Sequence, residues 1–273
     1  MLQVQRSRSR RNEDFGQSLR KPGEGNVAWV TRHAEPDSVY VLLLGGRSTW
    51  AQRLRTAQAQ LRHDLSPSHW SHVALLGPRG ARASGEVHEI PLLPRRGLED
   101  LPLSNGVVKS PLKDYDDPQQ HPNVGIVALP LAWAQVKAKV EEFKHQRTTI
   151  DALELQLAWL TFTWAVGRIS NPLYDRIGFA SAALLEYVAS ALAYDLTPAF
   201  PSGSSCPEAI WQAALYWYET PRMGPTSEKA SGIRGAYALG DGGSASASRA
   251  AKRPSPSKRA VPRASKTRKS ARR

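Results

Sequence analysis

The chain has 273 residues and carries 37 Lys and Arg against 24 Asp and Glu, a formal net charge of +13. Its 41% hydrophobic residues and 8 Trp can form a core, which excludes a wholly disordered chain, and its single Cys excludes a disulfide scaffold. It has no apolar stretch of the ~18 residues that a transmembrane helix needs, and no standard secretory signal. We therefore expect a protein of the reducing cytoplasm.

The positive charge lies at the two ends. Residues 249–273 hold 11 Lys and Arg and no acid, and residues 1–21 contribute +4, so residues 22–248 carry −2 of the total of +13. The tail is too poor in apolar residues to fold alone. We expect three regions, namely a basic disordered segment over 1–25, a folded domain over 26–239, and a disordered linker and basic tail over 240–273.

Apolar patterns predict an α+β domain. In chain order they indicate a strand at 37–44, a helix at 49–62, strands at 70–76, 85–93 and 124–129, a helix at 130–147 and a helix at 207–218. The segment 153–196 contains two strongly apolar helical stretches that Asn171 and Pro172 separate. We interpret it as a buried helical hairpin. The alternative is that 153–193 contacts lipid.

Cys206 precedes the last predicted helix, where Pro207 fits the first turn. Backbone N–H groups at a helix N-terminus favour a thiolate, and a thiolate is the nucleophile of acyl transfer. The alternative is an inert buried cysteine. Placement alone leaves both open.

A cysteine nucleophile needs a base, and His72 stands out among seven histidines because it lies within a predicted apolar strand. If Gly80 and Ala81 form a type II′ turn, the hairpin places Glu89 directly opposite His72, where a carboxylate would fix the imidazole tautomer. A slip of one residue would place His88 there instead.

A metal site is a further alternative. His63, His69 and His72 supply three imidazoles, and Asp64 lies nearby. However, His69 and His72 point to opposite sides of an extended segment. We therefore expect neither a metal nor another cofactor.

Three short segments resemble the circularly permuted branch of the NlpC-like, papain-fold cysteine hydrolases, whose relatives include lecithin:retinol acyltransferase. The matching segments are Ser71-His72-Val73-Ala74-Leu75, Val87-His88-Glu89-Ile90 and Cys206-Pro207-Glu208-Ala209-Ile210. The resemblance spans about 37–218. It implies a papain-like antiparallel sheet packed on helices, with Cys206 as nucleophile, His72 as base and Glu89 as the orienting group.

These observations support two hypotheses of different class. The first is a thiol hydrolase or acyltransferase that acts on an amide or ester through Cys206, His72 and Glu89. The second is a non-catalytic papain-like module whose tail, 249–273, binds nucleic acid or another polyanion. Such binding would depend strongly on salt.

Overall fold

The computed structural model describes residues 15–78, 85–93, 100–165, 167–198, 200–219 and 235–240, with side chains omitted for 217–219. The predicted turn at Gly80 and Ala81 and the basic tail lie outside these residues. Within them the chain forms an α+β structure, as the apolar patterns predict.

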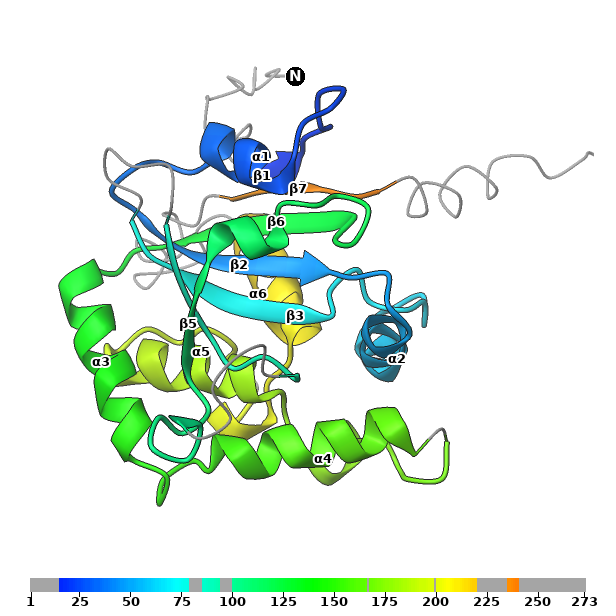
Figure 1. Ribbon diagram of the computed structural model, residues 1–273, viewed down its shortest axis with the longest axis vertical. Helices are drawn as coiled ribbons and strands as arrows, with labels where there is room; N and C mark the ends of the chain where they lie inside the picture. The colour runs from blue at the N-terminus through cyan, green and yellow to red at the C-terminus, as the bar shows by residue number, and fades with distance from the viewer. Residues whose placement is uncertain are drawn as a thin grey trace, which may run out of the picture.

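The described strands form one mixed sheet of seven strands in the order β1-β7-β6-β2-β3-β4-β5 (Figure 1). β1 and β7 run parallel, and every other neighbouring pair is antiparallel. The strands are β1 (Phe15–Gln17), β2 (Val39–Gly45), β3 (His72–Leu76), β4 (Glu86–Glu89), β5 (Val108–Pro111), β6 (Asn123–Leu129) and β7 (Gly235–Ala238).

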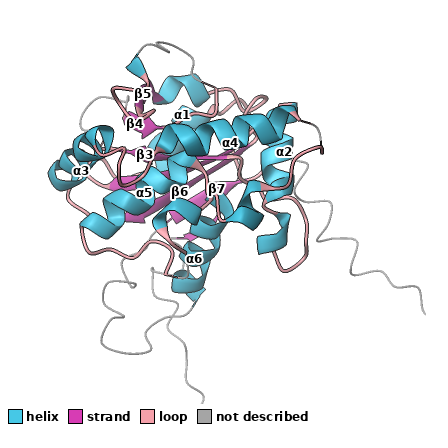
Figure 2. Ribbon diagram, turned by 90° about the horizontal axis from the view of Figure 1, so that it is seen from below, coloured by secondary structure: helices cyan, strands magenta, loops and turns pink. Residues whose placement is uncertain are grey.

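Six α-helices accompany the sheet in the described residues, and Figure 2 shows them gathered around the strands. They are α1 (Asn26–His33), α2 (Thr49–Ala57), α3 (Trp133–His145), α4 (Ala152–Trp164), α5 (Ala180–Ala191) and α6 (Pro207–Glu219). The 3₁₀ turns of the described residues are η2 (Ala59–Leu61) after α2, η4 (Leu112–Tyr115) between β5 and β6, η5 (Pro172–Asp175) between α4 and α5, and η6 (Ser202–Ser204) between α5 and α6. Ser48 caps α2 by accepting a hydrogen bond from the Ala51 N–H.

The central strands are buried on both faces, and a separate apolar cluster covers each face. The larger cluster joins alternate residues of β2 and β3 to α3, α5 and α6, and the smaller joins the intervening residues to α1 and η4. Burial on both faces explains why β2 and β6 are continuous apolar runs rather than alternating ones.

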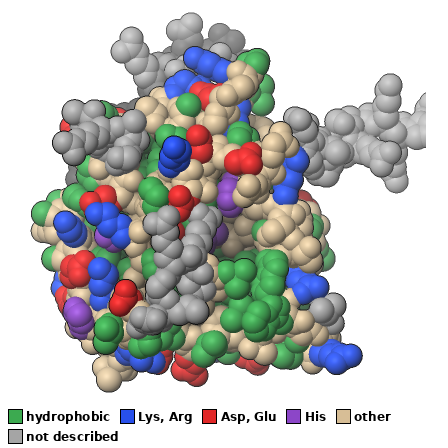
Figure 3. All heavy atoms as spheres, viewed as in Figure 1, with side chains coloured by type: hydrophobic (Ala, Val, Ile, Leu, Met, Phe, Trp, Pro, Cys, Tyr) green, Lys and Arg blue, Asp and Glu red, His purple; other side chains and the backbone are tan. Residues whose placement is uncertain are grey.

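The segment 153–196 folds as two separate helices with different environments. In α5, every residue from Ala180 to Glu186 is buried, which agrees with the buried interpretation. In α4, Leu157 and Trp164 are 61% and 62% exposed, and the Trp164 ring lies 5.7 Å from that of Trp50. Figure 3 shows hydrophobic side chains gathered where α2 and α4 meet. No helix among the described residues is both long enough and apolar enough to cross a membrane.

One boundary needs correction. Residues 15–25 belong to the segment that we expected to be disordered, yet Phe15–Gln17 forms β1 and pairs with β7. A strand of three residues has too little sequence for a periodic pattern. Its pairing partner also lies about 220 positions away along the chain, so the local sequence gives no indication of it.

Candidate functional site

His72 and Glu89 meet where β3 begins and β4 ends. The Nε2 atom of His72 lies 2.6 Å from Oε2 of Glu89. Leu75 lies opposite His88 and Leu76 opposite Val87, so the observed register is displaced by two residues from the predicted one, which placed Glu89 directly across from His72. Because side chains alternate between faces, a displacement of two residues keeps both on one face. The contact therefore forms diagonally.

Glu89 is a buried carboxylate held by several donors. Its side chain is 1% exposed, and it also accepts hydrogen bonds from the Ser110 hydroxyl of β5 and the Tyr115 hydroxyl of η4. Burial alone would raise the pKa of Glu89. The hydrogen bond and charge of His72, with the two hydroxyls, outweigh burial and leave the pKa below its ordinary value. The group is therefore a fixed anion at neutral pH.

An ionised Glu89 determines how the His72 imidazole is used. A carboxylate only accepts, so Nε2 carries the proton and Nδ1 is left with a lone pair when the ring is neutral. The Tyr115 ring is stacked on the imidazole, with 6.3 Å between ring centres. The arrangement holds one ring nitrogen as a base, which is the orientation that general-base chemistry requires.

Two cavities adjoin His72, whose side chain is 20% exposed. The larger is an open groove of about 680 Å³ between α2 and the end of the sheet, lined by residues that include Arg47, Trp50, Leu92 and Gln119. The smaller, about 30 Å³, lies between the imidazole and the start of α5. Figure 3 shows the surface hollowed beside histidine side chains above the hydrophobic patch of α2 and α4.

Cys206 lies elsewhere. It is 0% exposed and belongs to the core cluster of Val73 and Leu75, whose side chains alternate with that of His72 along β3. Of the described residues that line the two cavities beside His72, none is Cys206. The structure thus brings together two of the three predicted site residues and does not bring the third to them.

The electrostatics of Cys206 also differ from the expectation of a thiolate. Burial raises the pKa of the thiol to about 12, and the nearby carboxylates of Glu208 and Glu186 act in the same direction. Backbone N–H groups of the first turn of α6 lower it, as the sequence predicts, but their effect is smaller than that of burial. The thiol is therefore protonated at neutral pH.

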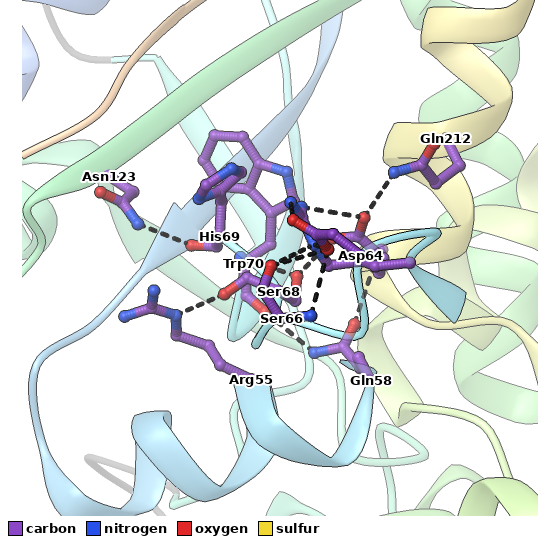
Figure 4. A network of polar contacts seen from close by, with 11 residues as sticks. Arg55, Gln58, Asp64, Ser66, Ser68, His69, Trp70, Asn123 and Gln212 are labelled. Carbon is purple, nitrogen blue, oxygen red and sulfur yellow. Dashed lines mark hydrogen bonds and ion pairs between the residues drawn. The ribbon is translucent and has the colours of Figure 1, made fainter. Parts of the chain in front are cut away.

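The N-terminus of α6 is held by a buried polar network (Figure 4). The Ser68 hydroxyl donates to Glu208 over 2.5 Å, and the Glu208 N–H donates to Oε1 of Gln58 over 2.8 Å. Gln58 also donates to the carbonyl of Trp70. These contacts join α6 to the segment between α2 and β3, so they account for Glu208 without a role in chemistry.

The alternative metal site does not form. The described residues contain no group of three His, Cys, Asp or Glu side chains that could hold a metal ion. Burial lowers the pKa of His69 to about 4, with nearby Arg62 and Arg55 acting the same way. Asp64 is instead paired with Arg62, at 3.1 Å.

Sequence reasoning missed Ser110 and Tyr115. Both come from the region of β5 and η4, and only the pairing of β4 with β5 brings them to Glu89. No local motif marks either residue as a partner of a distant carboxylate.

Comparisons with protein-family models, with curated proteins and with solved structures found no match to this chain.

Proposed function

We propose that this protein is a papain-like binding module in which His72 and Glu89 form part of a ligand groove, and that it works without a thiol nucleophile. The observation that carries this proposal is the burial of Cys206 away from both cavities beside His72. Because the chain has one cysteine, no other thiol can serve. This weighs against the thiol hydrolase and in favour of the non-catalytic module.

The groove has the features of a binding site rather than of packing. A fully buried carboxylate is costly unless it is paired, and here three side chains from β3, β5 and η4 converge on it to hold one imidazole at an open groove. An imidazole with one fixed N–H and one lone pair can hydrogen-bond a polar ligand. The apolar surface of Trp50 and Leu92 would cover the rest of that ligand.

The tail would then supply localisation. Its 11 cationic residues favour binding to a polyanion by release of counterions. We propose that this attachment is nonspecific, because the tail carries no aromatic residue on which a base could stack.

Alkylation of the native protein tests the absence of a thiol nucleophile. We expect iodoacetamide at pH 7.5 to leave Cys206 unmodified in the folded chain and to modify it after unfolding in guanidinium. Rapid native modification that is lost in His72→Ala would refute the proposal.

Deletion of 249–273 tests the tail: DNA binding and its salt dependence should disappear, and binding that survives the deletion would refute that part.

A second candidate function rests on the 2.6 Å contact between His72 and Glu89. The same pair would act as a general base on water or on a hydroxyl of the substrate, in a hydrolase that needs no thiol. Release of p-nitrophenol from short-chain esters, measured for the native protein and His72→Ala, distinguishes the two. Turnover that depends on His72 but survives Cys206→Ala would favour the hydrolase.

A further inference from the structure

The first residue of α5 shares a cavity with the imidazole. Ala180 begins the helix, and α5 packs against β3, the strand that carries His72. Ala180 and His72 both line the small cavity of about 30 Å³ at this junction. That space is about the volume of one water molecule or one extra heavy atom.

The side chains around this cavity offer no free nucleophile. The Ser181 hydroxyl accepts from the Ile90 N–H over 2.9 Å and donates to the Ile90 carbonyl over 2.7 Å. The Ser71 hydroxyl accepts from the Gly46 N–H over 3.0 Å and is 3.3 Å from the Leu44 carbonyl. Both hydroxyls are thus occupied by backbone groups. The remaining described residues of the lining carry no hydroxyl or thiol.

The backbone at Ala180 suits a nucleophile nonetheless. No side chain caps the N-terminus of α5, so the first N–H groups of the helix are not used by a capping side chain. These N–H groups and the helix dipole stabilise a negative charge near the first residue. The two bonds between Ser181 and Ile90 fix this end of α5 against the end of β4, one residue from Glu89.

We propose that Ala180 occupies the nucleophile position of an acyl-transfer centre, and that the groove therefore binds an ester or amide without cleaving it. This deepens the proposed function and rests on it, since it assigns a role to the ordered pair of His72 and Glu89 in a chain whose one thiol is buried. Ala180→Cys would supply the missing atom. His72 Nδ1 would take the thiol proton, and the thiolate would attack the electrophile.

The test uses the full chain with Cys206→Ala as background. In Ala180→Cys, the sulfur would form a bond to the methylene carbon of iodoacetamide, iodide would leave, and His72 would hold the proton. Ala191→Cys, at the exposed C-terminal end of α5, is the matched control for an ordinary thiol. We expect His72 and the helix N-terminus to lower the pKa of the thiol at position 180 by about 2 units relative to the thiol at position 191. The larger thiolate fraction is partly offset because a more acidic thiol is a weaker nucleophile, so alkylation at pH 6.5 should be about fivefold faster at position 180.

We expect this acceleration at position 180, and its loss in Ala180→Cys with His72→Ala. Equal rates at 180 and 191, no reaction at 180, or a fast reaction that is unaffected by His72→Ala would each overturn the inference. Thermal unfolding of every variant, monitored by circular dichroism, identifies one that does not fold. In that case Ala180→Ser, labelled with a fluorophosphonate and compared with its His72→Ala form, decides in the same way.

The failures of the two proposals are distinguishable. Rapid native modification of Cys206 that is lost in His72→Ala refutes the proposed function, whatever position 180 does. An unreactive thiol at position 180 refutes the present inference and leaves the binding module intact.

Discussion

Substitution of Glu89 by Gln tests whether a buried anion organises the site. Gln keeps the shape, but Ser110 and Tyr115 donate to different oxygens of Glu89, so the one amide oxygen of Gln can accept from only one of them. It removes the charge that pairs with His72 over 2.6 Å. A hydrogen bond to a charged group contributes about 1.5–3 kcal/mol, and relief of the buried charge offsets part of its loss. We expect a loss of about 2 kcal/mol at pH 7.

The assay is urea unfolding monitored by Trp fluorescence, which measures the free energy of unfolding. In a thermal melt, the same loss should lower the melting temperature by about 4–8 °C. Glu141→Gln is the control, because Glu141 forms an exposed ion pair with Lys144 and its removal should cost less than about 0.5 kcal/mol. If Glu89→Gln is no more destabilising than Glu141→Gln, the carboxylate does not carry the role assigned to it.

The pH dependence of the same variant gives an independent check. The pKa of Glu89 is lowered in the folded state, so its contribution is fully present above the unfolded value of about 4.3 and is lost as pH falls through the folded pKa. The stability difference between the native chain and Glu89→Gln should therefore shrink in acid, below about pH 4. A difference that stays constant from pH 7 to pH 3 would contradict a buried anion.

Three further predictions concern other groups. Burial raises the pKa of Glu186 to about 6 from 4.5, so ionisation of this group destabilises the fold as pH rises through this window. In urea unfolding, Glu186→Gln should therefore be more stable than the native chain by about 2 kcal/mol at pH 8, and should gain nothing below pH 4. Cys206→Ser should lose about 1–3 kcal/mol, since it buries a hydroxyl in the core, while Cys206→Ala loses less, as thermal melts will measure. Trp164→Ser should change stability by less than about 1 kcal/mol in the same melts, because the side chain is 62% exposed.

The elements that the sequence predicts share a long local pattern. β2 and β6 each have seven buried residues, and α5 buries seven consecutive residues from its start, so composition alone marks them. β1 and β7 are short and pair only with each other and with β6, at the edge of the sheet. Their formation depends on contacts between the two ends of the chain, which no window of sequence contains.

The register between β3 and β4 shows why a site can be predicted through an incorrect step. The predicted type II′ turn placed Glu89 opposite His72, and the observed pairing is two residues away. An even displacement preserves the face of every side chain, whereas an odd one would have put His88 beside His72. His88 instead faces the other side, with its ring 5.5 Å from that of Trp133. The predicted contact between His72 and Glu89 therefore required only that the register be displaced by an even number of residues, and did not require the predicted turn.

Cys206 illustrates the opposite case, in which residue type misleads. A thiol can be recognised in any sequence, and a helix N-terminus following it strengthens the inference. But the reactivity of a thiol depends on its access to reagents and on its ionisation. Cys206 is 0% exposed, so reagents do not reach it, and burial keeps the thiol protonated. An alanine carries no chemical signal, so nothing in the sequence draws attention to Ala180. Only the packing of α5 against β3 brings that residue and His72 to one cavity. The sequence cannot show that a nucleophile is missing beside His72, because only the folded structure identifies the position that such a nucleophile would occupy.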